Sequence, residues 1–126
     1  MEDHQGEEPI AQLARLLIEA YLKIGKLLMR LPITIGLPPV EGKDGIDGQV
    51  AADAIQRARE VLDDMPMDDM ASSMIDKLLL HWLIAQDLGA LILIMGEEEW
   101  RLEAMGYSLL QVSVLLQMAE LRLSQE

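Results

Sequence analysis

The chain has 126 residues, a formal net charge of −12 at pH 7 and no cysteine. This length fits one domain with its own core, and the lack of cysteine excludes disulfides, zinc–thiolate sites and cysteine nucleophiles. Because acidic residues outnumber basic ones by 22 to 10, we do not expect direct binding to nucleic-acid phosphates. The first residues show neither the basic nor the apolar segment of a secretory signal, and we expect a cytoplasmic protein.

The N-terminal part of the sequence predicts a short tail followed by a helix. We expect residues 1–8 to form a flexible acidic tail and residues 9–126 to form a single helical domain. Pro9 suits the first turn of a helix, and Pro32 ends that helix at or just before Leu31. Between them, polar residues recur at steps of three and four on an otherwise apolar segment. The pattern predicts a helix with one narrow polar stripe.

Residues 32–49 contain three prolines and four glycines and predict a long Pro/Gly-rich loop. Ile33, Ile35 and Leu37 alternate within it, as in a short extended segment that packs on helices. Asp44 and Asp47 resemble part of a calcium-binding loop, but the remaining ligand positions of such a loop are missing. We therefore expect a solvated loop and no metal.

Two further helices are predicted between residues 50 and 95. In the first, residues 50–65, one face is apolar; its expected members are Val50, Ala54, Ala58, Val61, Leu62 and Met65. Pro66 breaks this helix, and Asp68 or Asp69 caps the next one. The second helix ends before Gly96 and is apolar nearly all round from residue 78 onward. This composition predicts a buried central helix.

The last part of the sequence predicts two helices joined by a tight corner. Glu97, Glu98 and Glu99 favour a helix start, and Ser108 with Gln111 matches a capping box that opens a last helix to about residue 124. The stretch "LEAMGYSLLQVSVLL" resembles a helical hairpin of MerR-type transcription regulators, and its "MGYS" resembles the first loop of ubiquitin-associated domains. These resemblances imply a regulator or a ubiquitin-binding loop, whereas the residues themselves require only a packed corner with a positive φ at Gly106.

No catalytic, metal-binding or cofactor-binding pattern is visible in the sequence. His4 and His81 are the only histidines, and the sequence contains neither the E-x-x-H nor the H-x-x-x-H spacing of a helical metal site. No serine has a local base, and no glycine-rich nucleotide loop occurs. We therefore predict that the protein is not an enzyme and needs no cofactor.

The predicted fold is all-α: a compact bundle of four to five helices with an apolar central helix and one long Pro/Gly-rich loop. Several helices are apolar over more than half their circumference, which predicts homo-oligomers or docking of an apolar groove on a protein partner. The leading hypothesis is a protein-protein interaction module, an adaptor, assembly chaperone or regulator, acting through helix-groove contacts. The candidate apolar binding residues are Met67, Met70, Met74, Trp100 and Tyr107.

Two alternatives remain open. The first is an acidic inhibitor that mimics DNA and occupies the nucleic-acid site of a basic protein. Its candidate residues are Asp63, Asp64, Asp68, Asp69, Glu97, Glu98 and Glu99.

The second alternative is a small membrane-associated helical protein. Residues 78–95 approach the length of a membrane span, but Asp87 near the centre makes insertion costly and favours a buried helix. We expect Asp87 to lie at a solvent-exposed edge beside Gln86, or to pair with a basic residue of the first helix.

Overall fold

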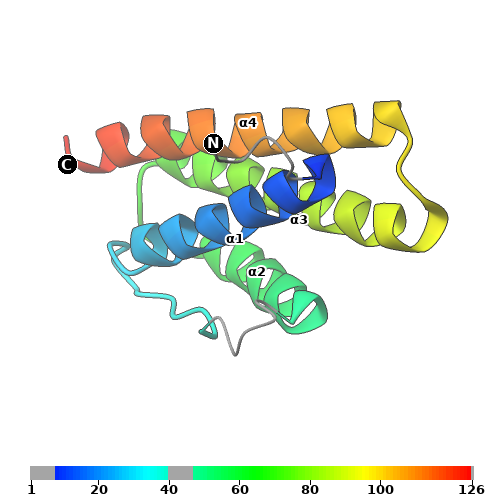
Figure 1. Ribbon diagram of the computed structural model, residues 1–126. Coiled ribbons are helices and arrows are strands. Elements are labelled where there is room, and N and C mark those ends of the chain that lie inside the picture. The colour runs from blue at the N-terminus through cyan, green and yellow to red at the C-terminus, as the bar shows by residue number, and fades with distance from the viewer. Residues whose placement is uncertain (1–7, 40–46, 126) are drawn as a thin grey trace.

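A computed structural model describes residues 8–39 and 47–125 of the chain. Those residues form four helices and no strand (Figure 1); the helices are α1 (Pro9–Leu28), α2 (Gly48–Leu62), α3 (Asp69–Met95) and α4 (Glu99–Leu123). Helix α3 packs against each of the other three, and a short turn joins it to α4 in an antiparallel hairpin. The prediction of an all-α bundle is confirmed.

Helix α1 begins at Pro9, as predicted, and ends at Leu28, slightly earlier than the sequence indicated. The segment after it folds back onto the core: the Ile35 N–H donates to the Leu28 carbonyl at 3.2 Å, and Leu37 is half-buried. Ile33 is exposed instead of packing on the helices. The predicted loop continues through residues 40–46, which lie outside the described residues, as does the tail 1–7.

Trp82 of α3 ties the centre of the bundle together. Its side chain is fully buried, and its indole N–H donates to the Leu17 carbonyl of α1 at 3.0 Å. Its ring lies 5.4 Å from the ring of Tyr21, whose hydroxyl donates to the Pro38 carbonyl at 2.7 Å. Burial raises the pKa of Tyr21, which keeps this hydroxyl protonated and able to donate. One aromatic pair thus holds α1, α3 and the segment after α1.

Carboxylates start α2 and α3, and an ion pair joins them. Asp47 caps α2 by accepting from the Gln49 and Val50 amides, so the helix starts slightly before the predicted residue 50. Asp68 caps α3 by accepting from the Ala71 amide at 3.0 Å. Arg59 of α2 donates to Asp76 of α3 at 2.9 Å.

The inner face of α2 differs in part from the prediction. Ala54, Ala58 and Leu62 are buried as expected, whereas Val50 and Val61 are exposed. Because α2 makes its close backbone approaches to α3, only the narrow face toward that helix is covered. The two valines lie at the edges of this face and remain in contact with water.

The prediction of a corner at residues 106–108 is wrong, because α4 is one continuous helix through Gly106 and Ser108. Among the described residues, Gly96 at the end of α3 is the glycine with a positive φ, at 100°. A glycine inside a helix costs about 1 kcal/mol, which the packing of buried residues on both sides of Gly106 offsets. The fifth helix is therefore absent from the described chain, and the two family resemblances lose the turn on which they depended.

Candidate protein-interaction surface

Helix α4 is apolar on two opposite faces. Its inner face is buried in the bundle and consists of Met105, Leu109, Val112, Leu116 and Ala119. Its outer face carries a second apolar row, with between 42% and 61% of each side chain exposed; we call this row the α4 stripe, and it consists of Tyr107, Leu110, Val114, Met118 and Leu121. Steps of three, four, four and three residues keep the stripe on one side of the helix over about 20 Å.

The stripe lies in an uncharged part of the chain. No acidic or basic residue occurs between Glu103 and Glu120, and the polar neighbours of the stripe are neutral, such as Gln111 and Gln117. The outer face of an ordinary surface helix carries charged residues. In a chain of net charge −12, this segment is an exception that solubility does not explain.

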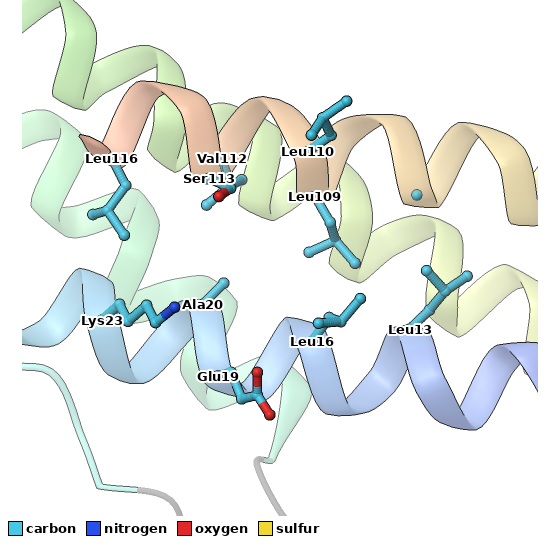
Figure 2. A pocket seen from close by; sticks show the side chains of 11 residues that line it. Leu13, Leu16, Glu19, Ala20, Lys23, Leu109, Leu110, Val112, Ser113 and Leu116 are labelled. Atoms are coloured by element: carbon cyan, nitrogen blue, oxygen red, sulfur yellow. The ribbon is translucent and has the colours of Figure 1, made fainter. Parts of the chain in front are cut away.

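A groove between α1 and α4 lies next to the stripe and extends its apolar surface toward α1. The groove encloses about 330 Å³, and its apolar lining includes Leu13, Leu16 and Ala20 of α1 and Leu109, Leu110 and Leu116 of α4. Figure 2 shows Leu109 and Leu116 extending toward α1, whereas Leu110 points away from it. Leu110 thus belongs to both the groove and the stripe. We call the combined area the α1–α4 surface.

The α1–α4 surface carries no net charge. Glu19 and Lys23 of α1 are the charged residues that line the groove, and their charges cancel. Leu16 beside them is 47% exposed. An apolar centre with few charged groups is what the buried part of a protein–protein interface requires, and the geometry suits a helix laid along the groove.

The structure does not bring the five predicted apolar residues together. Tyr107 lies in the α4 stripe, and Trp100 is exposed on the first turn of α4, where the Arg101 guanidinium lies 4.8 Å from its ring centroid. Met67, Met70 and Met74 lie at or near the start of α3, at the other end of that helix from α4's first turn.

The three methionines are placed differently from the prediction of one binding patch. Met67 and Met74 pack partly buried against the core, and Met70 is exposed. The remaining stripe residues from Leu110 onward were absent from the predicted set. Their signal was present in the sequence, as two apolar rows interleaved over an uncharged helix.

A second exposed apolar cluster lies where α3 turns into α4. Leu93 and Ile94 are 78% and 80% exposed, Met95 follows them directly, and Trp100 lies on the first turn of α4. Helix α3 is long and apolar enough to cross a membrane, and about a third of its most apolar part, 33%, is buried in the bundle. A core helix of a soluble protein has the same length and composition, so this finding does not distinguish the two settings.

The predicted acidic residues form two separate groups. Asp63, Asp64, Asp68 and Asp69 lie at the turn between α2 and α3, and Glu97–Glu99 lie at the turn between α3 and α4. These turns stand at opposite ends of α3, about 40 Å apart for a helix of this length. The carboxylates therefore do not make one continuous surface.

Asp68 has a structural role besides its charge. Its carboxylate accepts from the Arg122 guanidinium of α4 at 2.8 Å and from the Ala71 amide. The hydrogen bond from Arg122, followed by that from Ala71, lowers the pKa of Asp68. Elsewhere, Asp87 is exposed as predicted, and Gln86 next to it is half-buried.

Other features of the described chain offer less chemistry. No three His, Asp or Glu side chains in residues 8–39 and 47–125 are grouped so as to hold a metal ion. A further apolar cavity of about 500 Å³ lies between α1, the start of α2, α3 and Met105 of α4, and its polar lining comes from Glu8 and Gln86. The Nδ1 atom of His81 is buried without a hydrogen-bond partner.

Comparisons with known proteins add no relative. No protein-family model, no curated protein and no solved structure matches this chain. The proposal for its function therefore rests on the geometry of the molecule.

Proposed function

We propose that the chain is a non-enzymatic protein–protein interaction module and that its α1–α4 surface binds a helix of another protein chain. The observation that carries this proposal is the α4 stripe, an exposed apolar row on an uncharged helix whose other face is already buried. Single exposed apolar residues are common on protein surfaces and need no partner. A continuous row that joins a groove is characteristic of an interaction site.

The spacing of the stripe matches the way helices recognise each other. A helix laid against another presents anchors at steps of three and four residues, and these fill the spaces between the side chains of the partner. Leu110, Val114 and Met118 provide such anchors along the outer face, with the groove beside Leu110. Burial of these side chains contributes about 25 cal/mol per Å² of apolar surface removed from water.

The other hypotheses have less support. An inhibitor that mimics DNA needs closely spaced carboxylates along one face, whereas the two acidic groups lie at opposite ends of α3. Membrane association through the exposed end of α3 places Glu97–Glu99 next to the lipid headgroups. An anionic membrane surface repels such a cluster.

Site-specific photo-crosslinking in the native cell lysate tests the proposal. A photoreactive amino acid replaces Leu110 in one variant and, as a matched control, Gln56 on the exposed face of α2 in the other. We expect protein adducts from position 110 and few from position 56. Adding Val114→Glu to the first variant should abolish its adducts, because the glutamate places an unpaired charge in the interface. Equal adduct yields at the two positions would contradict the proposal.

A further inference from the structure

Building on the proposed function, we infer that the helix bound by the α4 stripe is α4 of a second copy of this chain, paired antiparallel about a two-fold axis at Val114. The stripe residues, their spacing and the charges around them lead to this assignment.

The spacing of the stripe is the same in both directions. From Tyr107 to Leu121 the steps are three, four, four and three residues, with Val114 at the centre. Two antiparallel copies centred there place Val114 beside its own counterpart and Tyr107 opposite Leu121. A two-fold interface requires one patch that is complementary to itself, and a symmetric row of apolar side chains meets this requirement.

The polar neighbours of the stripe follow the same symmetry. Gln111 and Gln117 lie three residues on either side of Val114, so each glutamine of one copy faces the other glutamine of its partner. A side-chain amide both donates and accepts hydrogen bonds, so these two residues can pair across the axis. The stripe segment itself brings no charged group to the interface.

Charge favours this face over the others for contact between two copies and sets their relative direction. Two chains of net charge −12 repel each other, and the uncharged segment between Glu103 and Glu120 is where they approach at least cost. A parallel pair would place Glu97–Glu99 of one copy beside the same three residues of the other. The antiparallel pair moves these clusters to opposite ends and also opposes the two helix dipoles.

The stripe alone is narrower than a stable dimer needs, and the groove supplies the rest. A standard interface buries about 800 Å² on each partner, whereas one face of a helix about 20 Å long and 10 Å wide offers less. Leu13 and Leu16 of α1 flank the stripe across the groove. The α1–α4 surfaces of two copies therefore face each other as two layers of helices, and each copy contributes both α1 and α4.

Single cysteines test the pairing, because the natural chain has none. Val114→Cys lies on the proposed axis, where two thiols come close enough for a disulfide, which needs Cα atoms within about 7 Å. Gln56→Cys on the exposed face of α2 is the control. With purified full-length chains under mild oxidation, we expect Val114→Cys to dimerise at least about tenfold faster, because pairing gives its thiols a millimolar effective concentration.

Two further cysteines test the direction. Tyr107→Cys alone should cross-link slowly, whereas its mixture with Leu121→Cys should give mixed dimers. Rapid cross-linking of Tyr107→Cys with itself would overturn the antiparallel arrangement.

The control also separates this inference from the proposed function. If Val114→Cys forms disulfide dimers no faster than Gln56→Cys, the inference of a second copy is wrong. In that case, adducts of the photoreactive residue at position 110 with another protein would leave the proposed function standing, and a lack of such adducts would overturn it too. Circular dichroism of each variant confirms that the helices remain formed.

Discussion

Helices α2 and α4 both bury one face in the bundle, but their outer faces differ. The outer face of α2 carries exposed polar and charged residues, among them Asp53, Gln56, Arg57 and Glu60. The outer face of α4 carries the apolar stripe instead. A helix with one apolar face needs one neighbour, whereas a helix with two apolar faces leaves one of them uncovered in the monomer. This difference is the basis for proposing that α4 is the part of the molecule that contacts another chain.

Truncation of a buried side chain on the inner face should have the largest effect on the free energy of unfolding. The effect should be similar in α2 and in α4. Ile55→Ala in α2 and Leu116→Ala in α4 each remove a buried side chain and leave a cavity. We expect each to lower the free energy of unfolding by about 2–5 kcal/mol. Urea denaturation followed by circular dichroism measures the loss. A neutral Leu116→Ala would show that the inner face of α4 is wrongly assigned.

Charges on the outer faces should separate the two helices. In the wild type we expect the melting temperature to rise with protein concentration, because association stabilises the folded state by mass action. The double variant Leu110→Glu/Val114→Glu should lose this dependence while its unfolding free energy at low concentration changes by less than about 0.5 kcal/mol. Gln56→Glu on α2 is the matched control, and its melting temperature should still rise with protein concentration. Loss of the dependence in the control would remove the distinction between the faces.

Two glycines test whether α4 is continuous. Gly106→Ala should raise the free energy of unfolding by about 0.5–1 kcal/mol, because alanine favours a helix and its added methyl would contact only Leu13 at 3.8 Å. Gly96→Ala should lower it, since φ at that position is 100°. Thermal melts of the two variants give the comparison. Destabilisation by Gly106→Ala would instead support a corner at this residue.

The link between the end of α4 and the start of α3 should have the smallest effect, and a pH-dependent one. Arg122 lowers the pKa of Asp68 below its ordinary value of 3.8, so the stabilisation is complete above that value and is lost as the pH falls through the folded-state pKa. Asp68→Asn keeps a cap for the Ala71 amide but removes the charge.

Urea denaturation at a series of pH values measures this link. The wild type should be more stable than Asp68→Asn at neutral pH, and the difference should shrink as the pH falls from about 5 toward 3. A difference that is constant over this range would show that the charge of Asp68 contributes nothing.

The sequence predicts the ends of helices well where a single residue determines the local backbone structure. Pro9 starts α1, Asp68 caps α3 and Gly96 ends it, all as expected from local backbone chemistry. The prediction fails at Gly106 and Ser108, because a local turn signal competes there with the burial of apolar residues on both sides, and the long-range contacts with α1 and α3 prevail.

The candidate site was harder to predict for a similar reason. Methionines and aromatic residues are candidate contact residues by their type alone, and Tyr107 is the stripe residue among the five predicted ones. The stripe is a property of the whole helix, and it becomes visible only when the buried row of α4 is known and a second row is left over. Which of the two rows faces the core depends on contacts between distant parts of the chain.

Sedimentation equilibrium of the unmodified chain and of Leu110→Glu/Val114→Glu tests the central claim, that a second copy covers the outer face of α4. The mass of one chain is 14.1 kDa. We expect the unmodified chain to approach twice that mass as its concentration rises and the double variant to remain at 14.1 kDa throughout. A monomer mass for both proteins at every concentration, or a dimer mass for both, would contradict the account.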